Sequence, residues 1–173
     1  MGSLPGAVDR RVHREIGLWF KDKLPGDYTV AEIATGIVPY YSELSTLDML
    51  GVNDHHIAHR DLPVGDEAAG QTAGHEKQDG AYVLLSRPEV IWLALELEPV
   101  ARSSPEDYMP PAYVRSAPVL IEVTQNAYVW VFYRPVAIRL AGGWLNLLVR
   151  RDATAPARRN DGNAVAAITV DAC

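Results

Sequence analysis

The stretch STLDMLGVNDHHIAHRD, residues 45–61, decides the fold class predicted for this chain. It begins with an apolar run of strand length that ends at Gly51, and it continues with a polar segment of one or two helical turns. Asn53 or Asp54 can accept hydrogen bonds from the first backbone N–H groups of that helix. The pattern therefore predicts a strand, a sharp turn and a helix, which is the repeating unit of an α/β fold.

The segments on either side repeat this alternation. Residues 8–24 carry apolar side chains at helical spacing, with Asp9 as a plausible N-cap and Pro25-Gly26 as the stop. β-branched and aromatic residues predict strands at 28–34, 45–50, 89–97 and 128–135, with a further edge strand at 164–170. We therefore predict a three-layer α/β fold, with a mostly parallel sheet, flanking helices and long polar loops.

The predicted domain organisation is a single α/β domain over residues 8–150, followed by a polar tail over residues 151–173 that is disordered or carries only the edge strand. Residues 62–80 are rich in glycine and polar side chains and predict a long surface loop. Residues 99–118 contain five prolines and predict a second irregular connection.

The composition excludes some partners. The formal net charge is −6, which gives no general basic surface for nucleic acid. The single cysteine, Cys173, permits no intramolecular disulfide. The first residues lack an apolar core of signal-peptide length, and the most apolar window, 127–149, is interrupted by Arg134 and Arg139. We therefore expect no signal peptide or transmembrane segment in this sequence.

Histidines raise the possibility of metal chemistry. His55 and His59 are four residues apart, so on a helix they share a face and can hold a transition metal. A third ligand would have to come from Asp61, His75 or elsewhere. The simpler interpretation is a solvated helix face with one or two packed histidines, and we assign no metal ligand or cofactor.

Other residues are candidates for ligand binding. Asp48 lies inside an apolar strand run, where a carboxylate must find a partner or face an edge. Tyr40 and Tyr41 are adjacent and can stack on a sugar ring or pack on the sheet. Asp54 can bind a ligand or serve only as a helix cap.

The segment GHEKQDG, residues 74–80, places His75, Glu76 and Lys77 between glycines. Such a polar loop can close over a ligand or form a solvated turn. The sequence has no nucleophile elbow, phosphate-binding glycine loop, dinucleotide fingerprint or paired-cysteine site. We therefore assign no catalytic residue.

Three motifs in order carry a resemblance to a known family. They are GIVPYYS at 36–42, LDMLGVNDHHIAH at 47–59 and GHEKQDGAYVLLSRPEVI at 74–91. Together they resemble the C-terminal, extracytoplasmic part of bacterial membrane glycosyltransferases that use polyprenyl-phosphate sugars, notably the actinobacterial arabinofuranosyltransferase-like proteins. The likeness covers residues 10–135. The motif positions carried over are Tyr40, Tyr41, Asp48, Gly51, Asp54, His75, Glu76 and Lys77.

The resemblance implies a location outside the cytoplasmic membrane and two possible partners, an acceptor glycan and a membrane-embedded glycosyltransferase portion. In the family the catalytic carboxylate belongs to that membrane portion, which this sequence lacks. We therefore expect a non-catalytic soluble module of a cell-envelope glycosyltransferase. The alternatives are a metal-dependent enzyme that uses His55 and His59, and a structural interaction module without a small ligand.

Overall fold

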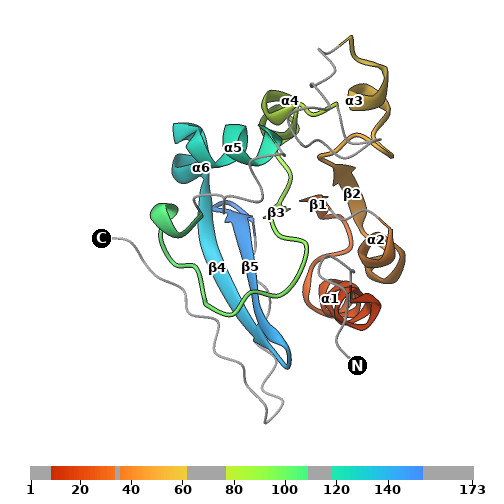
Figure 1. Ribbon diagram of the computed structural model, residues 1–173, viewed down its shortest axis with the longest axis vertical. Helices are drawn as coiled ribbons and strands as arrows, with labels where there is room; N and C mark the ends of the chain where they lie inside the picture. Colours follow the sequence, from red (N-terminus) through yellow and green to blue (C-terminus); the bar gives the residue numbers. More distant parts are fainter. Residues whose placement is uncertain (1–8, 34–35, 62–76, 109–117, 154–173) are drawn as a thin grey trace, which may run out of the picture.

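A computed structural model describes residues 9–33, 36–61, 77–108 and 118–153 of the chain. Figure 1 shows a central sheet with helices on both of its faces. The elements, in chain order, are α1 (Arg10–Lys23), β1 (Thr29–Glu32), α2 (Ile37–Ser42), β2 (Ser45–Asp48), α3 (His55–His59), α4 (Gly80–Leu85), β3 (Val90–Trp92), the 3-10 helix η2 (Pro105–Tyr108), α5 (Pro118–Gln125), α6 (Ala127–Phe132), β4 (Tyr133–Leu140) and β5 (Gly143–Arg150).

The sheet has five strands in the order β2-β1-β3-β5-β4. Strands β2, β1 and β3 are parallel, and their last residues lie in register, with Glu32 of β1 between Asp48 of β2 and Trp92 of β3. The antiparallel β4–β5 hairpin completes the other end. The predicted α/β class with flanking helices is confirmed, and the parallel part of the sheet is the part that leads into the candidate site.

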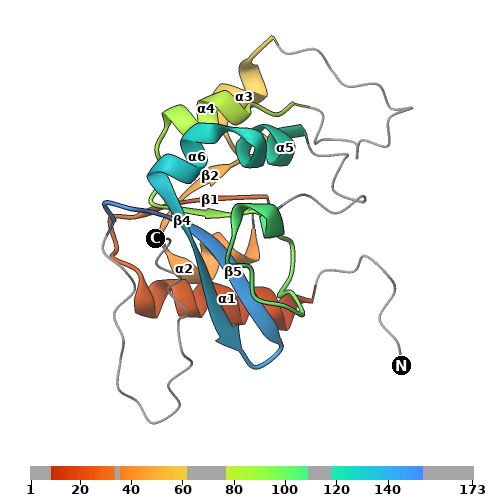
Figure 2. The same ribbon diagram turned by 90° about the vertical axis from the view of Figure 1, so that its left-hand side faces the viewer.

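Helices α1 and α2 cover one face of the sheet (Figure 2). The apolar stripe of α1 packs there against alternate strand residues, since successive strand side chains point to opposite faces. Gly17 allows α1 to approach α2 closely, because a Cβ at this position would lie 2.8 Å from Tyr41 Cβ and from the Val38 carbonyl oxygen. The buried residues of this layer are Ile16, Phe20, Leu24, Tyr28, Val30, Val38, Leu44, Val90, Trp92, Val136, Ile138, Leu145, Leu147 and Val149.

Helices α3, α4, α5 and α6 lie on the opposite face (Figure 2). The buried residues of this second layer are Ala31, Ile33, Leu47, Met49, Val83, Ile91, Tyr108, Val119, Leu120, Val123, Val129, Tyr133 and Leu148. Loops after β1, β2 and β3 leave the sheet at the carboxyl ends of the parallel strands, which is where open α/β sheets commonly bind ligands.

The strand predicted at 128–135 is wrong over its first five residues. Residues 127–132 form α6, and the strand begins at Tyr133. Asn126 caps the helix by accepting a hydrogen bond from the Tyr128 N–H, at 3.0 Å. Val129 is buried against the second layer. Local capping and tertiary packing have therefore overridden the strand propensity of these β-branched and aromatic residues.

The other predicted elements differ mainly at their bounds. The helix predicted at 8–24 is α1, which Asp9 caps as expected by accepting from the Arg11 N–H. The strand predicted at 89–97 is only three residues long, as β3. The edge strand predicted at 164–170 lies outside the described residues. Among the residues that the structure describes, no helix is long and apolar enough to cross a membrane.

Candidate functional site

The turn after β2 is built by Asp48 and Gly51. The buried Asp48 carboxylate accepts the Leu50 N–H at 3.0 Å and the Asn53 N–H at 2.7 Å. Gly51 has a φ of +75°, and a Cβ added there would lie 2.3 Å from Ile57 Cγ2. The carboxylate predicted to need a partner therefore stabilises the backbone that turns from the sheet into α3.

Asp54 connects this turn to α4. One oxygen of its carboxylate caps α3 by accepting the Ile57 N–H at 2.9 Å, as its position in the sequence predicted. The other oxygen accepts a hydrogen bond from the Tyr82 hydroxyl at 3.3 Å. Burial and the negative charge of Asp54 both raise the pKa of Tyr82, so this hydroxyl stays a donor at neutral pH.

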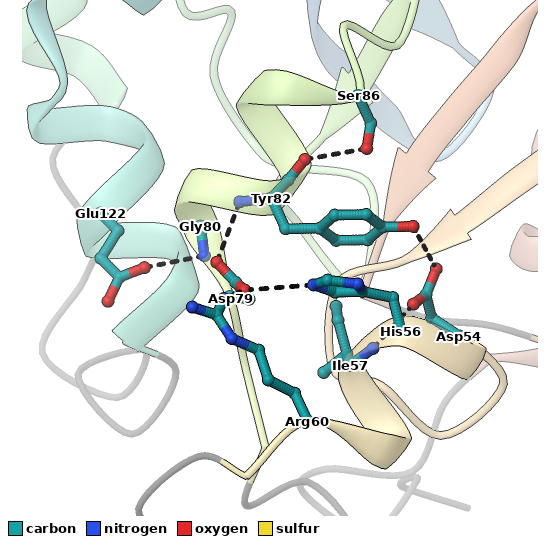
Figure 3. Close-up of polar contacts among 9 residues, drawn as sticks. All are labelled: Asp54, His56, Ile57, Arg60, Asp79, Gly80, Tyr82, Ser86 and Glu122. Atoms are coloured by element: carbon teal, nitrogen blue, oxygen red, sulfur yellow. Dashed lines mark hydrogen bonds and ion pairs between the residues drawn. The ribbon is translucent and has the colours of Figure 1, made fainter.

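Asp79 is the centre of the contacts between the two helices (Figure 3). Its side chain is only 5 % exposed and caps α4 by accepting the Tyr82 N–H at 2.9 Å. The same carboxylate forms an ion pair with Arg60, and its Oδ2 lies 3.7 Å from Nε2 of His56. One buried carboxylate thus holds a helix start, a guanidinium group and an imidazole ring together.

The imidazole of His56, like the Arg60 side chain, is about half exposed. Its ring stacks on the ring of Tyr82, with the centroids 4.0 Å apart and the planes 15° from parallel. About half of the His56 side chain, 47 %, stays exposed. We call the five residues Asp54, His56, Arg60, Asp79 and Tyr82 the α3–α4 cluster.

Lys77 connects the segment before α4 to α3 through a hydrogen bond. Its ammonium group donates to the carbonyl of Ala58 at 2.8 Å, and its own carbonyl oxygen lies 3.1 Å from the position of a Cβ on Gly51. Glu122 of α5 accepts the Gly80 N–H at 2.8 Å and secures the other side of α4 (Figure 3). The predicted residues Asp48, Asp54 and Lys77 therefore belong to one end of the sheet.

Tyr40 and Tyr41 are not part of that group. They lie on α2, which covers the opposite face of the sheet from α3 and α4 (Figure 2). Their rings pack edge to face with centroids 5.1 Å apart, and the Arg14 guanidinium lies over the Tyr41 ring. Two further predicted residues, His75 and Glu76, lie outside the described residues.

The histidines predicted as possible metal ligands stack on each other. The rings of His55 and His59 have centroids 4.1 Å apart, and Nδ1 of His59 lies 2.9 Å from the carbonyl oxygen of His55. Within the part of the chain that the structure describes, no group of three His, Cys, Asp or Glu side chains is placed to hold a metal ion. The pair by itself supplies too few ligands for a typical zinc site.

A buried carboxyl group that the sequence analysis missed lies at the end of β1. Glu32 is fully buried, and neither of its carboxyl oxygens has a hydrogen-bond partner among the described residues. The Nε1–H of Trp92, on the neighbouring strand, also lacks one within those ranges. Desolvation, with a smaller contribution from the Asp48 charge, raises the pKa of Glu32 to about 8.

Sequence reasoning could have found Glu32, because it is a charged residue inside an apolar strand, which is the signal that singled out Asp48. It could not have found the α3–α4 cluster as a unit. Arg60 and Asp79 look like ordinary surface residues until the fold brings α3 beside α4.

The comparisons with known proteins identify a family. Residues 7–147 match the family described as a domain of unknown function, DUF8728. The chain belongs to this family. No curated protein and no solved structure matches the chain. The matched range takes in strands β1 to β4, the first five residues of β5 and the whole α3–α4 cluster.

Proposed function

We propose that this chain is a non-catalytic module of a cell-envelope glycosyltransferase system, located on the extracytoplasmic side, and that it recognises the acceptor glycan through the α3–α4 cluster. The observation that carries the proposal is the contact between two of the motifs on which the resemblance rests. Residues 47–59 and 74–91 are separated in sequence, yet Lys77 donates to the Ala58 carbonyl and the Tyr82 hydroxyl donates to Asp54.

The chemistry of the cluster supports a sugar ligand. A sugar ring offers an apolar face and a rim of hydroxyl groups, so it suits a flat ring flanked by charged hydrogen-bonding groups. The stacked His56 and Tyr82 rings supply the flat surface. Arg60 and the carboxylates of Asp54 and Asp79 lie around it. Because Asp79 fixes both helices, the surface is held in place before a ligand arrives.

The absence of an assigned nucleophile or metal site in the sequence favours recognition over catalysis. A glycan chain makes many weak contacts, so we expect binding in the millimolar range for a short oligosaccharide, equivalent to about 4 kcal/mol.

The test is a titration of ¹⁵N-labelled protein with arabinan-type oligosaccharides, followed by amide chemical shifts. We expect the shifts to concentrate in residues 54–60 and 77–82. His56→Ala removes the outer ring of the stack and should abolish the saturable shifts. His55→Ala is the matched control, because His55 is an exposed histidine on the same helix whose ring stacks on His59.

The glycan proposal is overturned if the amide chemical shifts do not change with several millimolar oligosaccharide. This applies to arabinan-type and to other envelope oligosaccharides. Shifts that leave residues 54–60 and 77–82 unmoved and appear on α2 would place the sugar at Tyr40 and Tyr41 instead. Equal loss in the His56 and His55 variants would assign the effect to α3 in general and not to the stacked pair.

A further inference from the structure

The outer surface of α4 and α6 carries a cluster of exposed apolar side chains. Leu85 is 82 % exposed, Tyr128 is 69 %, Val131 is 62 % and Phe132 is 46 %. The rings of Tyr128 and Phe132 are parallel to within 3°. We call these four residues the α4–α6 patch. Leu85 lies on α4 and the other three on α6, two helices of the layer that covers the second face of the sheet (Figure 2).

A cavity lies within this patch. It has a volume of about 440 Å³, and residues of both helices contribute to it, with Ala81, Leu84 and Leu85 from α4 and Tyr128, Val129 and Phe132 from α6. Exposed apolar side chains scattered singly are common on soluble proteins. Here three of them, Leu85, Tyr128 and Phe132, line one hollow, which is typical of an interaction site.

Arginine side chains lie beside the apolar surface. Arg87 and Arg150 line the cavity, and Arg151 donates to the carbonyl of Trp130 in α6. Arg150 is already paired with Glu89 at 2.9 Å and with Asp152. The Arg87 side chain is 63 % exposed, and its guanidinium is 3.7 Å from Asp152. Arg87 and Arg150 thus pair with the carboxylates of Glu89 and Asp152, and Arg151 donates to a backbone carbonyl, so these five groups carry one excess positive charge in a chain of net charge −6.

We propose that the α4–α6 patch docks this domain on the surface of a phospholipid bilayer. Leu85, Tyr128, Val131 and Phe132 would enter the boundary between headgroups and acyl chains, where aromatic and aliphatic side chains are favoured. Arg87 and Arg151 would then contact lipid phosphates, for which a guanidinium group has complementary charge and geometry. The excess positive charge beside the apolar side chains favours a phospholipid over a purely apolar ligand, because a phospholipid also carries a phosphate group.

The size of the patch favours a bilayer over a protein partner. Helices α4 and α6 have six residues each and are therefore only about 9 Å long. A stable protein interface buries about 800 Å² on each partner and contains some twenty residues. Four exposed apolar side chains on two short helices are few for such an interface, whereas shallow insertion into a bilayer needs only a few side chains.

The test uses the full chain and vesicles without any other protein. Sedimentation is measured with vesicles of phosphatidylcholine alone and of phosphatidylcholine with one third phosphatidylglycerol. We expect binding to both, because both lipids present phosphate and the apolar side chains supply most of the affinity. The anionic lipid should strengthen binding by no more than about threefold, given a single excess positive charge at the patch.

Three variants separate the contributions. Leu85→Ser, Val131→Ser and Phe132→Ser together should weaken vesicle binding by about tenfold or more, since each removes exposed apolar surface. Arg87→Gln with Arg151→Gln should weaken it by about threefold to tenfold. The matched control is Leu18→Ser, Leu95→Ser and Val100→Ser, which removes three exposed apolar side chains elsewhere and should leave binding unchanged.

Protein that stays in the supernatant with both kinds of vesicle overturns the proposal and would redirect it to a protein partner. Equal weakening by the patch variant and the control variant also overturns it, because binding would then be non-specific. Circular dichroism of each variant verifies that the fold is retained. The vesicles contain no glycan, so this experiment and the oligosaccharide titration can fail independently.

Discussion

Two regions of the molecule, the α3–α4 cluster and the end of strand β1, differ in the hydrogen-bond partners of their carboxyl groups. In the α3–α4 cluster, Asp54 and Asp79 each accept a backbone N–H at a helix start, and Asp79 also pairs with Arg60. At the end of β1, Glu32 is fully buried with neither carboxyl oxygen hydrogen-bonded among the described residues. The first arrangement supplies hydrogen-bond donors to its carboxylates, whereas burial at the second raises the pKa of Glu32 and favours its protonated form.

This difference shows that burial alone does not determine whether a carboxylate is hydrogen-bonded. Asp48 lies beside Glu32 in the sheet and is equally inaccessible, yet two backbone N–H groups hold its charge. Glu32 is exposed to the repulsion of that charge, and no equivalent donor reaches it from the part of the chain that the structure describes. The two strand ends therefore differ in the hydrogen-bond donors around their carboxyl groups, and the following predictions test the contrast.

The largest effect is expected from Glu32→Gln. Between its ordinary pKa of 4.5 and its folded pKa of about 8, Glu32 is ionised in the unfolded chain and protonated in the native state, so folding stability falls as pH rises through this window. Removing the titration should stabilise the protein by about 3 kcal/mol at pH 7. The measurement is urea denaturation at pH 4, 7 and 8.5.

Below pH 4.5 the two proteins should differ little, because Glu32 is then protonated in both the folded and unfolded states. A Glu32→Gln variant that is less stable than the parent at pH 7, or a difference that does not change with pH, would show that the carboxyl group is ionised and paired in the native state.

Asp79→Ala should have the next largest effect, in the opposite direction. It removes the cap of α4 and the ion pair with Arg60, and we expect a loss of about 2–3 kcal/mol, less than for a fully buried pair because Arg60 is half exposed. The measurement is urea denaturation at pH 7. Asp79→Asn is the control, since it retains a capping oxygen and removes only the charge. If the asparagine and alanine variants lose the same free energy of unfolding, the cap contributes nothing to stability.

Gly51→Ala tests the turn that places α3. Its φ of +75° and the approach of Ile57 to within 2.3 Å of an added Cβ predict a loss of about 1–2 kcal/mol. Thermal unfolding should show the difference. Gly26→Ala is the control, because an added Cβ there meets nothing within 4 Å, and its melting temperature should change little. Equal effects at both glycines would contradict the proposed role of the turn.

The smallest effect is expected from added zinc. His55 and His59 stack on each other without a suitably placed third ligand in the described ranges, so stoichiometric zinc should leave the melting temperature unchanged. Differential scanning calorimetry with zinc and with chelator measures this. A rise with zinc that His59→Ala abolishes would restore the metal-dependent alternative.

The pattern of the sequence predicted several local elements, although it missed helix α5 and strand β5. Helix α1 has its apolar stripe and its Asp9 cap in the sequence, and the strand, Gly51 and Asp54 in residues 45–61 predict the β2–α3 unit. These features depend on side-chain periodicity and on backbone hydrogen bonding within a few residues, so a single sequence contains the necessary information. The helix at 127–132 escaped prediction, because its packing against the second layer overrode strand propensity.

Only the tertiary structure determined which of the predicted residues contact one another. It brought Lys77 to Ala58 and Asp79 to Arg60, and it placed Tyr40 and Tyr41 on the other face of the sheet. It also decided that Glu32 is buried without a hydrogen-bond donor among the described residues, while Asp48 receives two. The physical reason is that pairing and desolvation depend on groups far apart in the chain, whereas caps, turns and strand alternation depend on neighbours.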